Sequence, residues 1–169
     1  VILSKHQSTW ETFFLSAYFE PLSQVLKREL LNVPFFGWAI RLLKPIAIDR
    51  ENPKEALRQV AKQGLERLEQ GAWVLIFPEG TRVPVGQVGK FSRSGAALAV
   101  NAKLPILPVA HNAGTFWPKS GWGKRPGVIQ VVIGPAMHAE SEGPRAAAEL
   151  NQRAEDWINS TVAELERNV

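Results

Sequence analysis

The sequence predicts an α/β domain in which a layered, mixed sheet is flanked by helices. Short apolar runs rich in β-branched residues alternate with longer segments of helical periodicity. The 169 residues suit one domain, over residues 1–169, with a buried core. Hydrophobic residues make up 45% of the chain and charged residues 21%, as in ordinary globular proteins. Disorder is therefore not expected.

Five short runs are predicted to be buried strands, because each is apolar and bounded by Gly, Pro or charged residues. They cover residues 1–3, 46–48, 73–77, 106–110 and 128–133. Helices are predicted over residues 9–31, 92–102 and 144–166. Another helix follows Asn52, a good N-cap, with Pro53 at its first position, and ends at Gly71.

Composition excludes some chemistries and leaves others open. The net charge of +4 fits an anionic membrane surface, a phosphate-bearing substrate or nucleic acid equally well. Cysteine is absent, and the three histidines, His6, His111 and His138, are too far apart for a local metal motif, so no metal is expected. No apolar run approaches the roughly 18 to 20 residues that span a bilayer. The chain starts without Met inside a predicted strand, so we expect an upstream segment to be missing.

The stretch SKHQSTWE places His6 five residues before Glu11, directly after the first predicted strand. Ser8 to Glu11 has the S-x-x-E form of a capping box, which would make Glu11 a helix cap. The same carboxylate could instead orient the imidazole of His6, if His6 lies in the turn before the helix and folds back over its N-terminus. Spacing alone leaves both interpretations open.

Basic residues follow two of the predicted strands. The segment FPEGTR, 77–82, comes at a strand end, where α/β folds place ligand chemistry, and AIDR puts Arg50 just past another strand. Lys27 lies on the first predicted helix. Together Lys27, Arg50 and Arg82 indicate a phosphate site, because Arg offers two parallel hydrogen bonds and Lys a point charge. The alternative is ordinary solvated surface charge.

Four segments together resemble one enzyme family. They occur in the order and at roughly the spacing of the four sequence blocks of the glycerolipid acyltransferases. The segments are HQSTWE, LKREL…VPFFGW…AIDR, FPEGTR and LPILPVA. The chain resembles the PlsC-like 1-acyl-sn-glycerol-3-phosphate acyltransferases from His6 to about Gly134. The first segment is similar to the family's H-x4-D motif, with Glu11 where Asp is usual.

The resemblance implies a 1-acylglycerol-3-phosphate O-acyltransferase of phospholipid biosynthesis. Such an enzyme transfers an acyl chain from acyl-CoA or acyl carrier protein to the sn-2 hydroxyl of lysophosphatidic acid, giving phosphatidic acid, without a cofactor. It further implies a membrane-associated protein at the cytoplasmic face of the inner membrane, with no nucleic-acid partner. The alternatives are an acyltransferase for another lyso-lipid and a non-catalytic lipid-binding domain.

The family's site residues carry over position by position. His6 corresponds to the catalytic base and Glu11 to its acidic partner. The basic residues of the second block are Lys27 and Arg50. The acceptor-binding third block consists of Glu79, Gly80, Thr81 and Arg82, and the fourth block includes Pro108. Imidazole suits proton transfer near neutral pH. Direct transfer is favoured over an acyl-enzyme, because the chain has no Cys and no G-x-S-x-G.

Two further expectations concern charge and the membrane. A carboxylate repels phosphate, so Glu79 is expected to accept from a glycerol hydroxyl or to hold Arg82, while the three cations meet the phosphate. His111 is expected to be structural. The loop 117–125, with Trp117 and Trp122 among basic residues, could meet a membrane interface.

Overall fold

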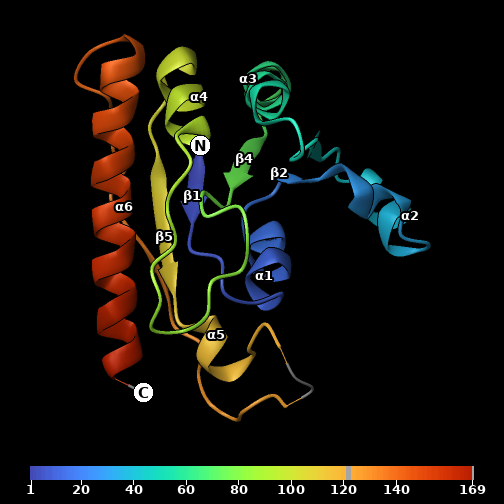
Figure 1. Ribbon diagram of the computed structural model, residues 1–169, viewed down its shortest axis with the longest axis vertical. Helices are drawn as coiled ribbons and strands as arrows, with labels where there is room; N and C mark the ends of the chain where they lie inside the picture. The colour runs from blue at the N-terminus through green and yellow to red at the C-terminus, as the bar shows by residue number, and fades with distance from the viewer. Residues whose placement is uncertain (121–122, 169) are drawn as a thin grey trace.

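Six strands form one mixed sheet in the computed structural model, which describes residues 1–120 and 123–168 (Figure 1). They are β1 (Ile2–Ser4), β2 (Leu22–Lys27), β3 (Ile46–Ile48), β4 (Trp73–Ile76), β5 (Leu107–His111) and β6 (Val131–Ile133). Their order across the sheet is β3-β2-β4-β1-β5-β6, with β6 antiparallel to β5 and all other pairs parallel. The carboxyl ends of β1 to β5 therefore lie along one edge.

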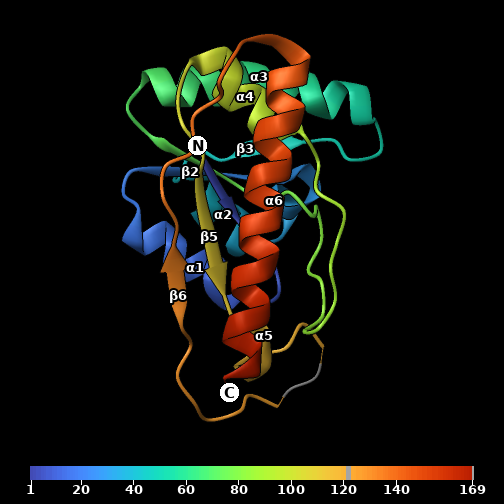
Figure 2. The ribbon, with the colours of Figure 1, turned by 90° about the vertical axis from the view of Figure 1, so that its left-hand side faces the viewer.

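Helices cover both faces of the sheet. They are α1 (Trp10–Tyr18), the 3₁₀ helix η1 (Arg28–Asn32), α2 (Phe36–Arg41), α3 (Pro53–Glu69), α4 (Ser94–Ala102), α5 (Ala113–Phe116) and α6 (Gly143–Arg167). The core under α3, α4 and α6 is the larger one, and α1 closes a smaller core on the other face. Figure 2 shows α6 lying lengthwise along β5. None of the helices in the described ranges is both long and apolar enough to cross a membrane.

Side chains alternate along the central strands, so each of these strands contributes residues to both cores. On β1, Leu3 belongs to the larger core, while Ile2 packs with the residues under α1. On β4, Ile76 belongs to the larger core and Leu75 to the core under α1. Each such side chain contributes about 1.5–3 kcal/mol when it is fully buried. Burial on both faces explains why these strands appear in the sequence as continuous apolar runs.

Most of the predicted elements are confirmed. The side chain of Asn52 accepts a hydrogen bond from the Glu55 N–H at 3.2 Å, and Pro53 opens α3. Gly71, directly beyond this helix, has φ of 81°, a left-handed conformation that glycine adopts without strain. The last predicted strand is shorter than expected, because only residues 131–133 pair with β5.

The predicted helix over residues 9–31 is wrong beyond Tyr18. Pro21 cannot donate a helical hydrogen bond, and the residues after it form β2 between β3 and β4. Leu22, Val25 and Leu26 have helical spacing, but they are buried on both faces of an interior strand. Lys27 therefore ends a strand instead of lying on a helix. The short helices α2 and α5 were not predicted.

Candidate active site

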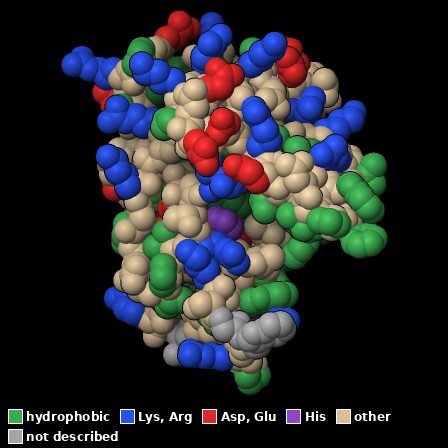
Figure 3. Space-filling view, turned by 45° about the vertical axis from the view of Figure 1, so that its right-hand side comes forward, with side chains coloured by type: hydrophobic (Ala, Val, Ile, Leu, Met, Phe, Trp, Pro, Cys, Tyr) green, Lys and Arg blue, Asp and Glu red, His purple; other side chains and the backbone are tan. Residues whose placement is uncertain are grey.

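The turn that carries His6 joins β1 to α1 at the carboxyl edge of the sheet, as predicted. Its imidazole stacks on Phe77, just past β4, with ring centroids 4.1 Å apart and planes at 17°. The side chain is 16% exposed, so part of the ring remains accessible to a ligand. Figure 3 shows a histidine at the floor of a hollow, with basic side chains on two sides of it.

One oxygen of Glu11 performs both functions that the sequence left open. Its Oε1 lies 2.9 Å from His6 Nδ1 and accepts backbone hydrogen bonds from Gln7 at 2.9 Å and Ser8 at 2.8 Å. An ionised carboxylate only accepts, so Nδ1 carries the imidazole proton and Nε2 is free to take another. The bond to Ser8 N is half of a capping box. Orientation and capping are therefore combined.

Glu11 remains ionised although its side chain is fully buried. Burial raises its pKa, but the hydrogen bond from His6, the influence of His111 and the backbone bond from Ser8 outweigh burial, and the pKa lies below the ordinary 4.5. The other oxygen, Oε2, has no hydrogen-bond partner in the described part of the chain. Glu11 thus places a negative charge beside His6 at neutral pH.

Glu79 holds the His6 turn with both of its oxygens. Oε1 lies 2.6 Å from Lys5 Nζ, and Oε2 accepts from the His6 backbone N–H at 2.9 Å. The Lys5 and Glu79 side chains are 1% and 0% exposed. The Val83 N–H donates to the His6 carbonyl at 2.8 Å, so both backbone polar groups of His6 are bonded to residues 79–83. Acceptor binding by Glu79 stays a prediction, whereas its contacts make it a positioning residue.

We expect Glu79→Gln to lower the free energy of unfolding by about 3–5 kcal/mol, because it leaves Lys5 buried without a counter-charge. Adding Lys5→Met should recover part of this loss, since no buried charge then remains. Urea unfolding of the parent, single and double variants measures both effects.

The exposed pair of Lys103 and Glu142, 3.0 Å apart, provides the matched control. Glu142→Gln should cost less than about 1 kcal/mol, because water screens that pair. If Glu79→Gln cost no more than Glu142→Gln, the buried pair would not hold the turn.

His111, fully buried at the end of β5, supports the same turn. Its Nε2–H donates to the Lys5 carbonyl at 2.8 Å, and its Nδ1 accepts from the Ala113 N–H at 3.3 Å. Burial lowers its pKa from the ordinary 6.5, although Glu11 and the Lys5 carbonyl oppose this, so the ring is neutral at pH 7. His111 is structural, as expected. Sequence reasoning missed Lys5, whose charge beside His6 was the available signal.

The basic residues of the second block lie farther from His6. Arg50, just past β3, donates from Nη1 to the carbonyl of Gly80, which turns the chain with φ of 69°. Thr81 is exposed next to it. Lys27, at the end of β2, pairs instead with Glu29, with Nζ and Oε1 3.3 Å apart and both side chains about half exposed. Arg50 therefore joins the FPEGTR turn, whereas Lys27 lies on the same sheet edge and is paired with Glu29.

Arg82 crosses to the start of α1 rather than to Glu79. Its Nη1 donates to Thr9 Oγ1 at 2.9 Å, which places a guanidinium beside the His6 turn. Its carbonyl accepts from Lys119 Nζ at 3.1 Å. In the loop 117–125, Lys124 Nζ lies 4.1 Å from the Trp117 ring centroid, and Trp122 lies outside the described residues. The expected contact of Glu79 with Arg82 is thus replaced by one with Lys5.

The arrangement combines a proton acceptor, an ionised orienting group and cations at one sheet edge. The described side chains include no group of three or more His, Asp or Glu that could hold a metal ion. A base of this kind can take a proton from a hydroxyl, and the cations beside it can attract an anionic group.

Comparisons with known proteins identify the family of this chain. A family model described as "Acyltransferase" matches residues 1–112. A 1-acyl-sn-glycerol-3-phosphate acyltransferase of Pseudomonas aeruginosa is 79% identical over 165 residues, which are 98% of this chain and 64% of that protein. One from Saccharomyces cerevisiae is 31% identical over 171 residues, 98% of this chain and 56% of that protein. The chain thus spans less than two thirds of these relatives.

The fold agrees as well. The crystal structure of the 1-acyl-sn-glycerophosphate (LPA) acyltransferase PlsC from Thermotoga maritima matches with a TM-score of 0.79 and 28% identity, covering 98% of this chain and 65% of that one. The resemblance seen in the sequence motifs and the mixed α/β fold are both confirmed. The chain belongs to the acyltransferase family.

Proposed function

We propose that this chain transfers an acyl group from acyl-CoA or acyl carrier protein to the sn-2 hydroxyl of lysophosphatidic acid, giving phosphatidic acid. The observation that carries the proposal is the 2.9 Å contact of His6 Nδ1 with Glu11 Oε1, at a residue whose backbone N–H and C=O are both hydrogen-bonded. It leaves Nε2 as a base of fixed orientation. The choice of acceptor is supported by the relatives from Pseudomonas aeruginosa and Saccharomyces cerevisiae, which are 1-acyl-sn-glycerol-3-phosphate acyltransferases.

The reaction follows from this geometry. His6 Nε2 takes the proton of the acceptor hydroxyl while the oxygen attacks the thioester carbonyl. The charge of Glu11 stabilises the imidazolium that forms, as a buried carboxylate does beside other catalytic histidines. The attack gives a tetrahedral intermediate, which collapses as the C–S bond breaks. His6 returns the proton to the leaving thiolate, which departs as a thiol. A new ester C–O bond remains, and no protein nucleophile or cofactor takes part.

The acceptor phosphate is assigned to the cations of the site. Arg82 is the first choice, because its contact with Thr9 places it at the start of α1, beside His6. Arg50 follows through its bond to Gly80, and Lys27 comes last because it pairs with Glu29. Gly80 and Thr81 form the turn between these arginines, where backbone and hydroxyl groups can meet the glycerol.

A panel of acyl-CoA and acyl carrier protein donors against several acceptors tests the proposal by mass spectrometry of the products. We expect phosphatidic acid from lysophosphatidic acid to form at least about tenfold faster than product from monoacylglycerol, which lacks the phosphate. Arg82→Lys tests the assignment of the phosphate. This variant keeps the charge but loses the two parallel hydrogen bonds, so the acceptor KM should rise more than the donor KM.

The other outcomes are distinct. Faster acylation of another lyso-lipid would replace lysophosphatidic acid as the acceptor. Lipid binding without any product would instead identify a non-catalytic lipid-binding domain.

The proposal also places the enzyme on a membrane surface, at the cytoplasmic face of the inner membrane. The donors are water-soluble carriers, whereas the acceptor and product are lipids that remain in a bilayer. Exposed apolar and basic side chains support the membrane surface as the place of binding.

A further inference from the structure

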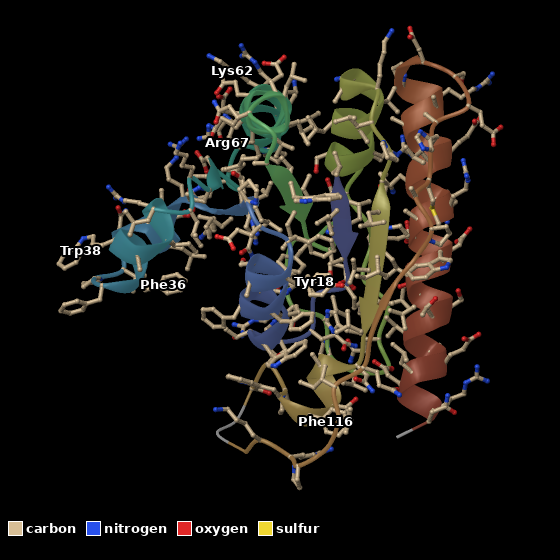
Figure 4. The ribbon with its side chains drawn as sticks, turned by 180° about the vertical axis from the view of Figure 1, so that it is seen from behind. Tyr18, Phe36, Trp38, Lys62, Arg67 and Phe116 are labelled. Carbon is tan, nitrogen blue, oxygen red and sulfur yellow. The ribbon has the colours of Figure 1, made fainter. Side chains whose placement is uncertain are left out.

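The segment that follows β2 projects from the body of the protein and exposes apolar side chains. Figures 1 and 4 show α2 standing away from the sheet, with the labelled Trp38 pointing outward. The most exposed apolar residues here are Val33, Phe35, Trp38, Leu42 and Leu43, with exposed fractions of 43%, 78%, 62%, 82% and 52%. We call these five residues the apolar ridge. The Phe35 and Trp38 rings also contact each other, with centroids 5.2 Å apart, and clustered exposed apolar side chains indicate an interaction surface.

The backbone of the ridge is strained in a way that keeps an aromatic side chain exposed. The Phe36 N–H donates to the Pro34 carbonyl at 2.7 Å, which makes Phe35 the centre of a γ-turn. Phe35 has φ of 62° and ψ of −56°, a conformation that is rare and unfavourable for a bulky residue. In water this position loses stability through both strain and exposure, whereas contact with an apolar phase would compensate for the exposure.

Gly37 holds the projecting segment in a defined shape. It is buried, and a Cβ at this position would overlap the carbonyl of Leu31 in η1. Helix α2 can pack this closely on η1 only because residue 37 is glycine. The direction of the ridge is therefore determined by the fold.

Charge around the ridge indicates which surface it meets. Residues 27–44 contain four cations, Lys27, Arg28, Arg41 and Lys44, and one anion, Glu29. Apolar residues flanked by Lys and Arg are typical of segments that bind anionic lipid interfaces. Two copies of this segment would bring like charges together, which disfavours self-association. The complementary partner is an anionic bilayer.

The ridge lies next to the proposed acceptor site. Helix η1 continues directly from β2, whose end carries Lys27, and β3 next to it leads to Arg50. In Figure 3 the hydrophobic side chains gather on the projecting part of the same face that shows the recessed histidine. By contrast, Trp117 of the loop 117–125 is half-buried and lies under Lys124. Among the described residues, the ridge therefore exposes its aromatic side chains more than Trp117 does.

We propose that the apolar ridge enters the interface of an anionic lipid bilayer and so brings the His6 site to a lipid acceptor. This inference rests on the proposed function for its purpose, but it is tested without catalysis. The chain is mixed with vesicles of phosphatidylethanolamine and phosphatidylglycerol, or of phosphatidylcholine alone, and floated through a density gradient.

The test variant is Phe35→Gly/Trp38→Ser/Leu42→Ser, and the matched control is Leu57→Ser on α3, where Leu57 is 50% exposed. We expect the test variant to partition into the anionic vesicles at least about tenfold less than the parent, and the control to match the parent. High salt should weaken parental binding, and phosphatidylcholine vesicles should bind less.

Phe35→Gly alone separates a lipid role from a structural one. Glycine tolerates the positive φ, so this variant should unfold at the same or a higher urea concentration than the parent while binding vesicles less tightly. A structural role for Phe35 predicts a lower unfolding midpoint.

Equal partitioning of parent and test variant, or no vesicle binding by the parent, would overturn the inference. A parent that sediments as a dimer while the test variant is a monomer would assign the ridge to a second copy. Failure of acyl transfer with every acceptor would reject the proposed function and leave the flotation result standing.

Discussion

His6→Ala should lower turnover by about 10²- to 10⁴-fold while the domain stays folded. The ring makes a hydrogen bond to Glu11 and a stack on Phe77, but it takes part in neither hydrophobic core, so its removal deletes the base without removing a core side chain. The backbone bonds of residue 6 to Glu79 and Val83 do not depend on its side chain. The chemical step therefore fails for lack of a proton acceptor.

Steady-state assays of phosphatidic acid formation, with circular dichroism to confirm folding, measure this effect. His138→Ala is the matched control, because His138 is exposed and outside the site; it should retain parental turnover. Near-normal acyl transfer by a folded His6→Ala variant would refute the general-base mechanism.

The second large effect is expected for Glu11→Gln, which should lose at least about tenfold in turnover. The amide oxygen can still accept the three hydrogen bonds of Oε1, but the charge that stabilises the imidazolium is gone. The amide NH₂ would take the place of Oε2, which has no partner among the described residues. Burying it unpaired should also cost about 1–3 kcal/mol of stability.

Ser8→Ala separates capping from orientation. Ser8 Oγ accepts from the Trp10 N–H at 3.1 Å, and its loss should cost about 0.5–2 kcal/mol, similar to the cost at Glu11. Turnover of the folded Ser8→Ala protein should stay near the parental value. If folded Glu11→Gln also turned over normally, the carboxylate would serve as a cap only, and His6 would be oriented by another group.

Local patterns were sufficient where the interacting residues are close in sequence. His6 and Glu11 are five positions apart, so a turn followed by one helical turn can bring them together. Asn52, Pro53 and Gly71 delimit α3 by the same kind of local chemistry. The sequence motifs also identified the acyltransferase family, because they are specific combinations of residue types and spacings.

The spacing of apolar residues was ambiguous in β2, because a strand that is buried on both faces can have the same apolar spacing as a helix. Leu22, Val25 and Leu26 repeat at helical spacing, and only the pairing of β2 with β3 and β4 shows that the segment is extended. Pro21 was the local signal that could have divided the predicted helix.

The sequence by itself determined the α/β class and the order of the motif segments, because short-range spacing and periodic burial encode these, and it reduced the role of Glu11 to capping or to orienting His6. Only the tertiary structure decided the partner of Glu79, since Lys5 lies 74 positions away and the two meet where the carboxyl ends of β1 and β4 converge. It also decided the exposure of the apolar ridge. Hydrophobicity alone does not distinguish a side chain that packs in a core from one that projects from the body, because only the surrounding chain determines whether water can reach it.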